Sequence, residues 1–373
     1  MKKEVYEAVS ILIGMTIGAG VLGIPYVISK SGFLIGFLFI ILIGLAIMTI
    51  NLFFGEIVLR TKGDHQLTGY AERYLGKFGK IIISITMTLG IYGALIAYLI
   101  VGSESLSAIF TGPVIYYLIG YFILMALIVL FGFKTIVKSE FIISGMMIFV
   151  VLIICLVGFT KIDFSNLKSV NVSYLFYPYG IILFAYLGLA AVPEMKEELV
   201  KNKKDLKKAI MIGALIPMVV YLLFAFVVVG VTGKNTTEIA TLGLSNIFGW
   251  QIVLFGNLFA LFAVSTGFLA LGLALKEMYN YDYKLNKYVS WALVCFIPFI
   301  FLLLFRNVNF RDIINVSGVL TGGIEGIIVI LMFYRAKKYG DRKPEYSLNK
   351  NYLIGALIML MFILGIIFGL NLF

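Results

Sequence analysis

Long apolar runs separated by short polar segments repeat along the whole chain. Eleven of them reach the roughly 20 residues that a helix needs to cross the hydrocarbon core of a bilayer. The runs lie at about 5–30, 33–59, 81–111, 113–132, 137–160, 174–195, 206–232, 249–276, 288–305, 311–334 and 351–371. They are too long and too apolar for the strands of a membrane barrel, and their number is odd. The pattern therefore predicts an all-α integral membrane protein with eleven transmembrane helices.

The composition agrees with a membrane protein. Of the 373 residues, 61% are hydrophobic and only 13% are charged, whereas a soluble domain of this size needs more polar surface. No segment is polar enough to form a separate soluble domain, so we expect one transmembrane domain over residues 1–373. Cys155, Cys295 and the single histidine, His65, form neither a metal-site spacing nor a disulfide framework.

The positive residues gather on alternate sides of the predicted spans. With a cytoplasmic N-terminus, 24 Lys and Arg residues fall inside and 6 fall outside. The net charge of +11 is therefore a signal of membrane topology and not of nucleic-acid binding. We expect a multi-pass protein of the cell membrane with its N-terminus in the cytoplasm and its C-terminus outside. The longest loops, 61–80, 196–208 and 335–350, are then cytoplasmic. We expect 196–208, which mixes Glu and Lys, to be a solvated loop, with contact to anionic lipid head groups as a second interpretation.

The first apolar run contains helix-breaking residues. Four glycines and one proline stand between Gly14 and Pro25. A glycine costs about 1 kcal/mol in a helix interior and a proline about 3 kcal/mol, so a continuous helix is unfavourable here. Backbone that leaves a helix at membrane depth is tolerated only where protein or a polar cavity surrounds it. A helix that restarts there offers amides to a carboxylate, and the freed carbonyls offer oxygens to a cation.

The sixth run is interrupted in a similar way, by Gly188 and Pro193. Breaks in spans one and six are typical of a transporter built from two inverted repeats, because five spans separate them and five is odd. The alternative is close packing, since glycine-rich stretches also let neighbouring helices approach each other.

Three stretches resemble the amino acid/auxin permease branch of the amino acid–polyamine–organocation superfamily. They are the first-run motif at 15–25 (MTIGAGVLGIP), the loop at 67–80 (LTGYAERYLGKFGK) and the sixth run at 184–194 (FAYLGLAAVPE). The resemblance implies the leucine-transporter fold, with five plus five inverted helices and an added eleventh. Repeat one then covers about 5–160, repeat two about 174–334, and the extra helix about 351–371.

The resemblance also implies where an amino acid substrate binds. Its α-carboxylate would meet the amides of Ala19, Gly20 and Val21. Its ammonium group would meet carbonyls of Ile17 and of the second break at Tyr186, Leu187 and Gly188. Many relatives carry an acid just after the sixth-run glycine, whereas this chain has Ala190 near there. We therefore expect a neutral substrate, hydrophobic or aromatic, with the Tyr186 side chain as a wall or gate of its pocket.

The sequence leaves open whether sodium or a proton is the coupling ion. Sodium-coupled relatives suggest the carbonyls of Met15 and Gly18 with the hydroxyls of Ser265 and Thr266, because oxygen ligands suit a hard cation. The alternative is that those hydroxyls bond back to the preceding turn of their own helix.

A proton would need an intramembrane acid, and Glu104 and Glu325 are the candidates. Either acid could equally be protonated and hydrogen-bonded between helices. Some relatives use a lysine in the fifth helix, but span 137–160 has none beyond Lys138 at its cytoplasmic end. No other cofactor is expected.

Other functions fit the sequence less well. A transporter of the same fold for a metal ion or a nucleobase is one alternative, and a non-transporting membrane sensor is another. No group of residues indicates an enzyme, and no phosphate-binding loop is present in the sequence. The sequence does not determine the oligomeric state.

Overall fold

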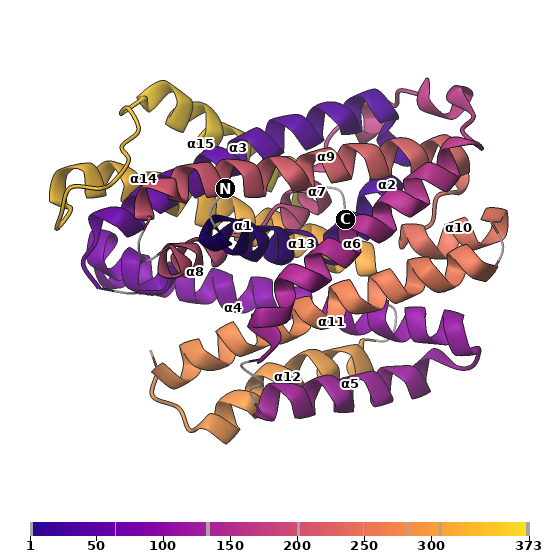
Figure 1. The fold of residues 1–373 in the computed structure, drawn as a ribbon, viewed down its shortest axis with the longest axis horizontal. Coiled ribbons are helices and arrows are strands. Elements are labelled where there is room, and N and C mark those ends of the chain that lie inside the picture. The colour runs from indigo at the N-terminus through magenta and orange to yellow at the C-terminus, as the bar shows by residue number, and fades with distance from the viewer. Residues whose placement is uncertain are drawn as a thin grey trace.

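The computed structural model describes residues 3–63, 65–131, 135–199, 202–248, 250–281, 283–305 and 308–370. Side chains are described there except at 135–144, 245–247, 250–253, 281 and 370. The regular elements in these ranges are helices (Figure 1). The α-helices are α1 (Lys3–Thr16), α2 (Gly20–Ser31), α3 (Phe33–Arg60), α4 (Leu67–Phe110), α5 (Val114–Phe131), α6 (Thr135–Phe159), α7 (Tyr179–Ala185), α8 (Ala191–Glu198), α9 (Leu206–Thr232), α10 (Ala240–Phe248), α11 (Trp250–Tyr281), α12 (Lys287–Leu304), α13 (Phe310–Ser317), α14 (Gly323–Tyr339) and α15 (Tyr352–Leu370). Short helical turns are η1 (Phe164–Leu167), η2 (Val172–Tyr174), η3 (Lys203–Asp205), η4 (Gly233–Asn235) and η5 (Gly318–Gly322).

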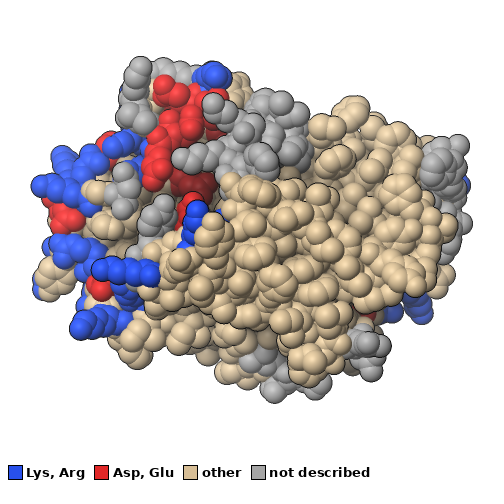
Figure 2. All heavy atoms as spheres, turned by 90° about the horizontal axis from the view of Figure 1, so that it is seen from below, with Lys and Arg blue, Asp and Glu red and all other residues tan. Residues whose placement is uncertain are grey.

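Most of these helices have the length and apolarity of membrane spans. Among the described residues, eight helices qualify, or nine if the bent pair α1 and α2 is one span. Figure 2 shows charged side chains gathered at one end of the molecule, beside a wide surface almost without charge. That surface needs an apolar solvent, which confirms the predicted all-helical membrane protein.

The spans differ in how much of their surface other helices cover. The window within Phe310–Tyr339 is 72% buried and that within Lys203–Asn235 is 61% buried, so α9, α13 and α14 lie in the interior. The helices α5, α12 and α15 are only 33%, 22% and 28% buried and present apolar side chains outward. Figure 1 shows α5 and α12 together along one edge, where Phe122 stacks on Phe299 with ring centroids 3.9 Å apart.

Two regions that the sequence predicts to be loops contain helix. Residues 67–80 were expected in a cytoplasmic loop, but α4 begins at Leu67 and turns at Gly76, where φ is 75°. Glycine tolerates this left-handed backbone, so it joins a short helix to the long span. The segment after α9 likewise holds α10, which covers part of α11. Both helices are too short or too polar to register as apolar runs.

One predicted span contains a further irregularity. Between α13 and α14 the chain forms one turn of π-helix, η5, at Gly318–Gly322. A side chain on Gly318 would collide with the carbonyl oxygen of Gly180 in α7, so these helices touch through backbone. Single π-helical turns occur mostly at functional sites, and this one lies beside the cavity described below.

Candidate functional site

The first break separates α1 from α2. Helix α1 ends at Thr16, α2 begins at Gly20, and the two axes are bent by 54°. The Gly18 amide turns back to the Thr16 carbonyl at 3.0 Å, which closes a tight turn in place of a helical bond. No side chain caps the start of α2. The amides of Gly20 and Val21 therefore lack the side-chain acceptor that often satisfies the first amides of a helix.

The second break separates α7 from α8. Helix α7 ends at Ala185 and α8 begins at Ala191, which leaves residues 186–190 outside both helices. The Tyr186 amide still bonds to carbonyls of the last turn of α7, at 3.1 Å and 3.2 Å. Beyond it, Leu187 and Gly188 continue without helical backbone, and the sequence prediction of an interrupted sixth span is correct.

The two breaks touch each other. A Cβ atom on Gly20 would lie 2.6 Å from the Cα atom and 2.7 Å from the Cβ atom of Ala185. Only a residue without a side chain lets the start of α2 lie against the end of α7 at this distance. Gly188 also lies close to α1, because a Cβ atom on it would be 3.0 Å from the Thr16 hydroxyl oxygen. The non-helical backbone of both spans therefore lies in one place.

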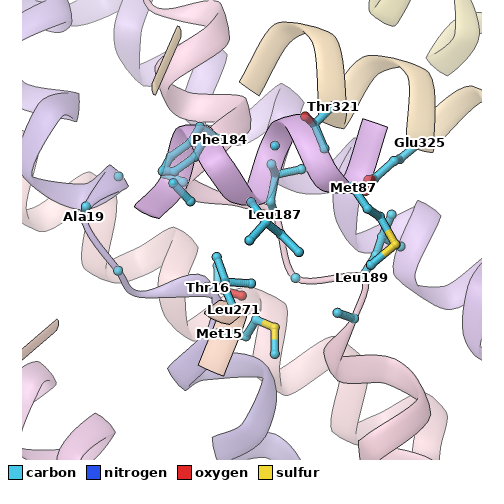
Figure 3. A pocket seen from close by; sticks show the side chains of 18 of the residues that line it. Met15, Thr16, Ala19, Met87, Phe184, Leu187, Leu189, Leu271, Thr321 and Glu325 are labelled. Atoms are coloured by element: carbon cyan, nitrogen blue, oxygen red, sulfur yellow. The ribbon is translucent and has the colours of Figure 1, made fainter. Parts of the chain in front are cut away.

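A cavity opens at the two breaks; its empty space, counted together with the open solvent at its mouth, is about 710 Å³. Most of its lining is apolar, and the polar side chains that reach it include Thr16, Tyr98, Thr321 and Glu325. The full lining is Met15, Thr16, Gly18, Ala19, Gly20, Leu67, Met87, Gly90, Ile91, Ala94, Tyr98, Phe184, Ala185, Leu187, Gly188, Leu189, Ala190, Leu271, Thr321 and Glu325. Figure 3 shows Ala19 at one side of this cavity and Glu325 with Met87 at the other, with Leu187 between them.

The predicted substrate-binding residues divide into two groups. Ala19, Gly20, Leu187 and Gly188 line the cavity, as the sequence indicates. Ile17 and Val21 are fully buried and lie outside the lining, as does Tyr186.

The prediction for the Tyr186 side chain does not hold in this structure. Its hydroxyl donates to the Ile40 carbonyl of α3 at 3.2 Å, and its ring packs between helices. The neighbouring Phe184 reaches the cavity in its place (Figure 3). The last residues of α7 still follow helical geometry, which decides which side chain faces inward.

Tyr98 of α4 is a residue that the sequence did not single out. Its hydroxyl oxygen lies 3.3 Å from the place that a Cβ atom on Gly18 would occupy. It lies 2.9 Å from the corresponding place on Gly267 in α11. It therefore stands between the first break and α11, with its polar atom beside the non-helical backbone. The chain has 22 tyrosines, so no local pattern distinguishes this one.

Two of the four predicted sodium ligands line the cavity and two do not. Met15 and Gly18 belong to the lining, whereas Ser265 and Thr266 lie outside it. Ser265 shares a hydrogen bond of 3.0 Å with the Tyr121 hydroxyl of α5. The Thr266 hydroxyl bonds back to the Phe262 and Ala263 carbonyls at 3.0 Å and 3.1 Å. This is the back-bonding alternative to ion binding.

The two intramembrane acids have different surroundings. Glu325 lies on α14 just after η5, is buried and lines the cavity, and its Oε1 has no hydrogen-bond partner among the described residues. Glu104 lies near the C-terminal end of α4, outside the cavity lining, with Glu238 as a neighbouring acid. The side chain of Lys138 lies outside the described residues.

Interrupted transmembrane helices that meet at an apolar cavity are typical of a membrane permease. This chain has the leucine-transporter fold. The structure superimposes on the crystal structure of MhsT in complex with L-phenylalanine with a TM-score of 0.71. The match covers 98% of this chain and 97% of that chain, at 14% identity.

The chain matches the tryptophan/tyrosine permease family over residues 1–369 and belongs to that family. It is therefore an amino acid permease and not an enzyme. It is 25% identical over 358 residues to "Tyrosine-specific transport system 1" of Haemophilus influenzae, covering 89% of this chain and 88% of the relative. It is 23% identical over 368 residues to "Glutamine transporter 2" of Aliivibrio fischeri, covering 94% and 93%.

Proposed function

We propose that this protein is a secondary active transporter that carries neutral amino acids, hydrophobic or aromatic ones above all, by alternating access. The observation that carries the proposal is the apolar cavity at two touching helix breaks. Such breaks offer amides to a carboxylate and carbonyls to an ammonium group, which together recognise any α-amino acid. The relatives are named for tyrosine and glutamine and the solved structure for L-phenylalanine, all of them neutral amino acids.

The substrate carboxylate would lie at the start of α2, against the amides of Ala19, Gly20 and Val21. The Tyr98 hydroxyl is close enough to Gly18 to donate to the same carboxylate. The ammonium group would meet carbonyls of the two breaks. The side chain would extend between Met87, Leu187, Leu271 and other apolar residues of the lining. A cavity wall of this kind favours a hydrophobic side chain over a charged one.

A proton is the coupling ion that the side chains support best. Glu325 is a buried acid without a partner for Oε1, and it faces the same cavity as the two breaks. A carboxyl group placed there can take up and release a proton while the substrate passes. The hydroxyls expected to bind sodium are hydrogen-bonded elsewhere. Glu325 is therefore our first candidate for proton coupling, ahead of Glu104.

The topology in the membrane is part of the proposal. The nine spans identified by length and apolarity, together with α6 and the broken pair α7 and α8, make eleven. We propose two inverted repeats of five spans, at about 5–160 and 174–334, followed by α15. The N-terminus would be cytoplasmic and the C-terminus outside, in the cell membrane. The charged end in Figure 2 would face the cytoplasm, with its Lys and Arg residues near anionic lipid.

Uptake into liposomes tests the function directly. Purified protein is reconstituted and offered labelled L-tyrosine, L-tryptophan, L-phenylalanine, L-glutamine, L-lysine and L-glutamate. A pH gradient and a sodium gradient are imposed in separate experiments. We expect accumulation of neutral amino acids under the pH gradient, abolished by a protonophore. If none of the six accumulates under either gradient, the proposed function is wrong; accumulation driven by sodium alone would overturn the coupling.

A further inference from the structure

Tyr221 of α9 lies directly behind the two breaks. Its side chain is fully buried and packs on the ring of Tyr186, with centroids 5.1 Å apart. The Tyr221 hydroxyl is 2.8 Å from the Thr16 carbonyl oxygen and 2.8 Å from the Ala185 carbonyl oxygen. Thr16 is the last residue of α1, and Ala185 is the last residue of α7. One phenol thus contacts the final carbonyl of both interrupted helices.

Both carbonyls lie at helix ends. The last carbonyls of a helix have no intrahelical donor, and they carry the partial negative charge of the helix dipole. In interrupted transmembrane helices such ends can hold a cation. Here the Tyr221 hydroxyl lies between them, and the Thr16 carbonyl also accepts from the Gly18 amide at 3.0 Å. The hydroxyl carries a single hydrogen, so the two carbonyls share it as their common donor.

We propose that Tyr221 is a positioning residue for the substrate site, and the idea rests on the proposed transport function. Its hydroxyl joins the end of α1 to the end of α7 at the point where a bridging cation could otherwise sit. Tyr221 itself lies outside the cavity lining, whereas Thr16 and Ala185 belong to it. The tyrosine therefore acts through these two residues and keeps the backbone groups of both breaks in one arrangement.

This role predicts a specific kinetic effect. Without the hydroxyl, the two helix ends lose their common donor, and the empty site can adopt several arrangements. A substrate that contacts both breaks must then order them, and this cost appears in binding. Once the substrate is bound, it holds the breaks itself, so transport at saturation changes less. The loss of the hydroxyl should therefore raise KM more than it lowers the maximal rate.

The test compares Tyr221→Phe with Tyr346→Phe. Each change removes one hydroxyl that donates to a backbone carbonyl, but the Tyr346 hydroxyl bonds to Leu52 of α3 at 2.7 Å, away from both breaks and outside the cavity lining. Initial rates of L-tyrosine uptake are measured in liposomes that contain equal amounts of monodisperse protein. We expect KM to rise about tenfold in Tyr221→Phe, as for the loss of one buried hydrogen bond, and to stay within about twofold of wild type in Tyr346→Phe.

Hydrogen–deuterium exchange provides a readout that needs no substrate. We expect the amides of 17–20 and of 186–190 to exchange faster together in Tyr221→Phe, and neither set to do so in Tyr346→Phe. A wild-type KM in Tyr221→Phe, equal KM changes in the two variants, or unchanged exchange at either break would overturn the positioning role. If wild-type protein transports none of the six amino acids, the proposed function fails, and exchange still decides whether Tyr221 joins the two helix ends.

Discussion

The Cα atom of Ala185 lies 2.6 Å from the place that a Cβ atom on Gly20 would occupy. The two residues belong to different spans, and each lies where an interrupted helix begins or ends. This contact brings the non-helical backbone of both spans to one cavity. It also explains why a glycine stands at position 20, for a reason that does not depend on backbone flexibility.

Adding one methyl group at position 20 should disturb the site. In Gly20→Ala the new Cβ atom meets the backbone of Ala185, which cannot move aside as a flexible side chain could. Overpacking of this kind costs about 1–3 kcal/mol, so we expect KM for L-tyrosine to rise by roughly tenfold or more. The measurement is the concentration dependence of uptake in liposomes.

The matched control for this variant is Gly120→Ala in α5. A Cβ atom there has no atom within 4 Å, so the same chemical change meets open space. We expect wild-type kinetics from Gly120→Ala. Equal effects of the two substitutions would show that the close contact between the breaks is not what matters.

The Tyr98 hydroxyl should contribute to substrate affinity. Hydrogen bonds to charged groups contribute about 1.5–3 kcal/mol, so Tyr98→Phe should weaken binding by about tenfold to a hundredfold. Tyr92→Phe is the control on the same helix, because the Tyr92 hydroxyl bonds to Tyr279 and lies outside the cavity lining. Binding of labelled L-tyrosine to detergent-solubilised protein measures both. Wild-type affinity in Tyr98→Phe would remove this residue from the carboxylate site.

Replacing Glu325 should separate substrate exchange from proton coupling. Glu325→Gln keeps the size and polarity of the side chain but cannot take up and release a proton at physiological pH. We expect exchange of labelled for unlabelled substrate to continue, while accumulation driven by a pH gradient is lost. Glu104→Gln should accumulate substrate normally, because Glu104 lies outside the cavity lining. Gradient-driven accumulation that persists in Glu325→Gln would exclude Glu325 as the coupling site.

The hydroxyls of α11 should be unimportant for coupling. Thr266 bonds back to its own helix and Ser265 bonds to Tyr121. We therefore expect Ser265→Ala and Thr266→Val to leave KM and the response to sodium at wild-type values, because hydroxyls already hydrogen-bonded within the protein are not available to an ion. A loss of sodium-stimulated uptake in either variant would instead support the sodium site suggested by the sequence.

A buried charge at the charged end of the molecule should matter for stability. The Glu56 carboxylate is fully buried and pairs with Lys337 at 2.6 Å and with Arg60 at 2.7 Å. It also accepts a hydrogen bond of 2.6 Å from the Leu348 amide, which ties the segment before α15 to α3. Breaking a buried pair by removing one partner costs about 3–5 kcal/mol, because the other charge is left uncompensated.

We therefore expect Glu56→Gln to lower the midpoint of thermal unfolding in detergent clearly. The control is Glu72→Gln, whose partner Lys80 lies in a more exposed pair and should contribute little. If Glu56→Gln unfolds at the wild-type temperature, the pair with Lys337 is not a main source of stability.

The sequence by itself determined the class of this protein and the location of both breaks. Apolar runs long enough to cross a bilayer form helices, because a helix satisfies its backbone hydrogen bonds within one segment. Clustered glycine and proline interrupt such a helix. Gly18, Gly20 and Gly188, which the sequence singles out, line the cavity. Each of these inferences depends on local backbone energetics, which a single segment of sequence contains.

The tertiary structure alone decided which side chains face the cavity. Tyr186 and Phe184 are equally plausible from their sequence, but the orientation of the last turn of α7 turns Phe184 inward and Tyr186 toward α3. Tyr98 and Tyr221 act at the breaks from other helices, and no local pattern marks them. Their roles depend on distances between segments far apart in the chain, and these distances are set by how the helices pack.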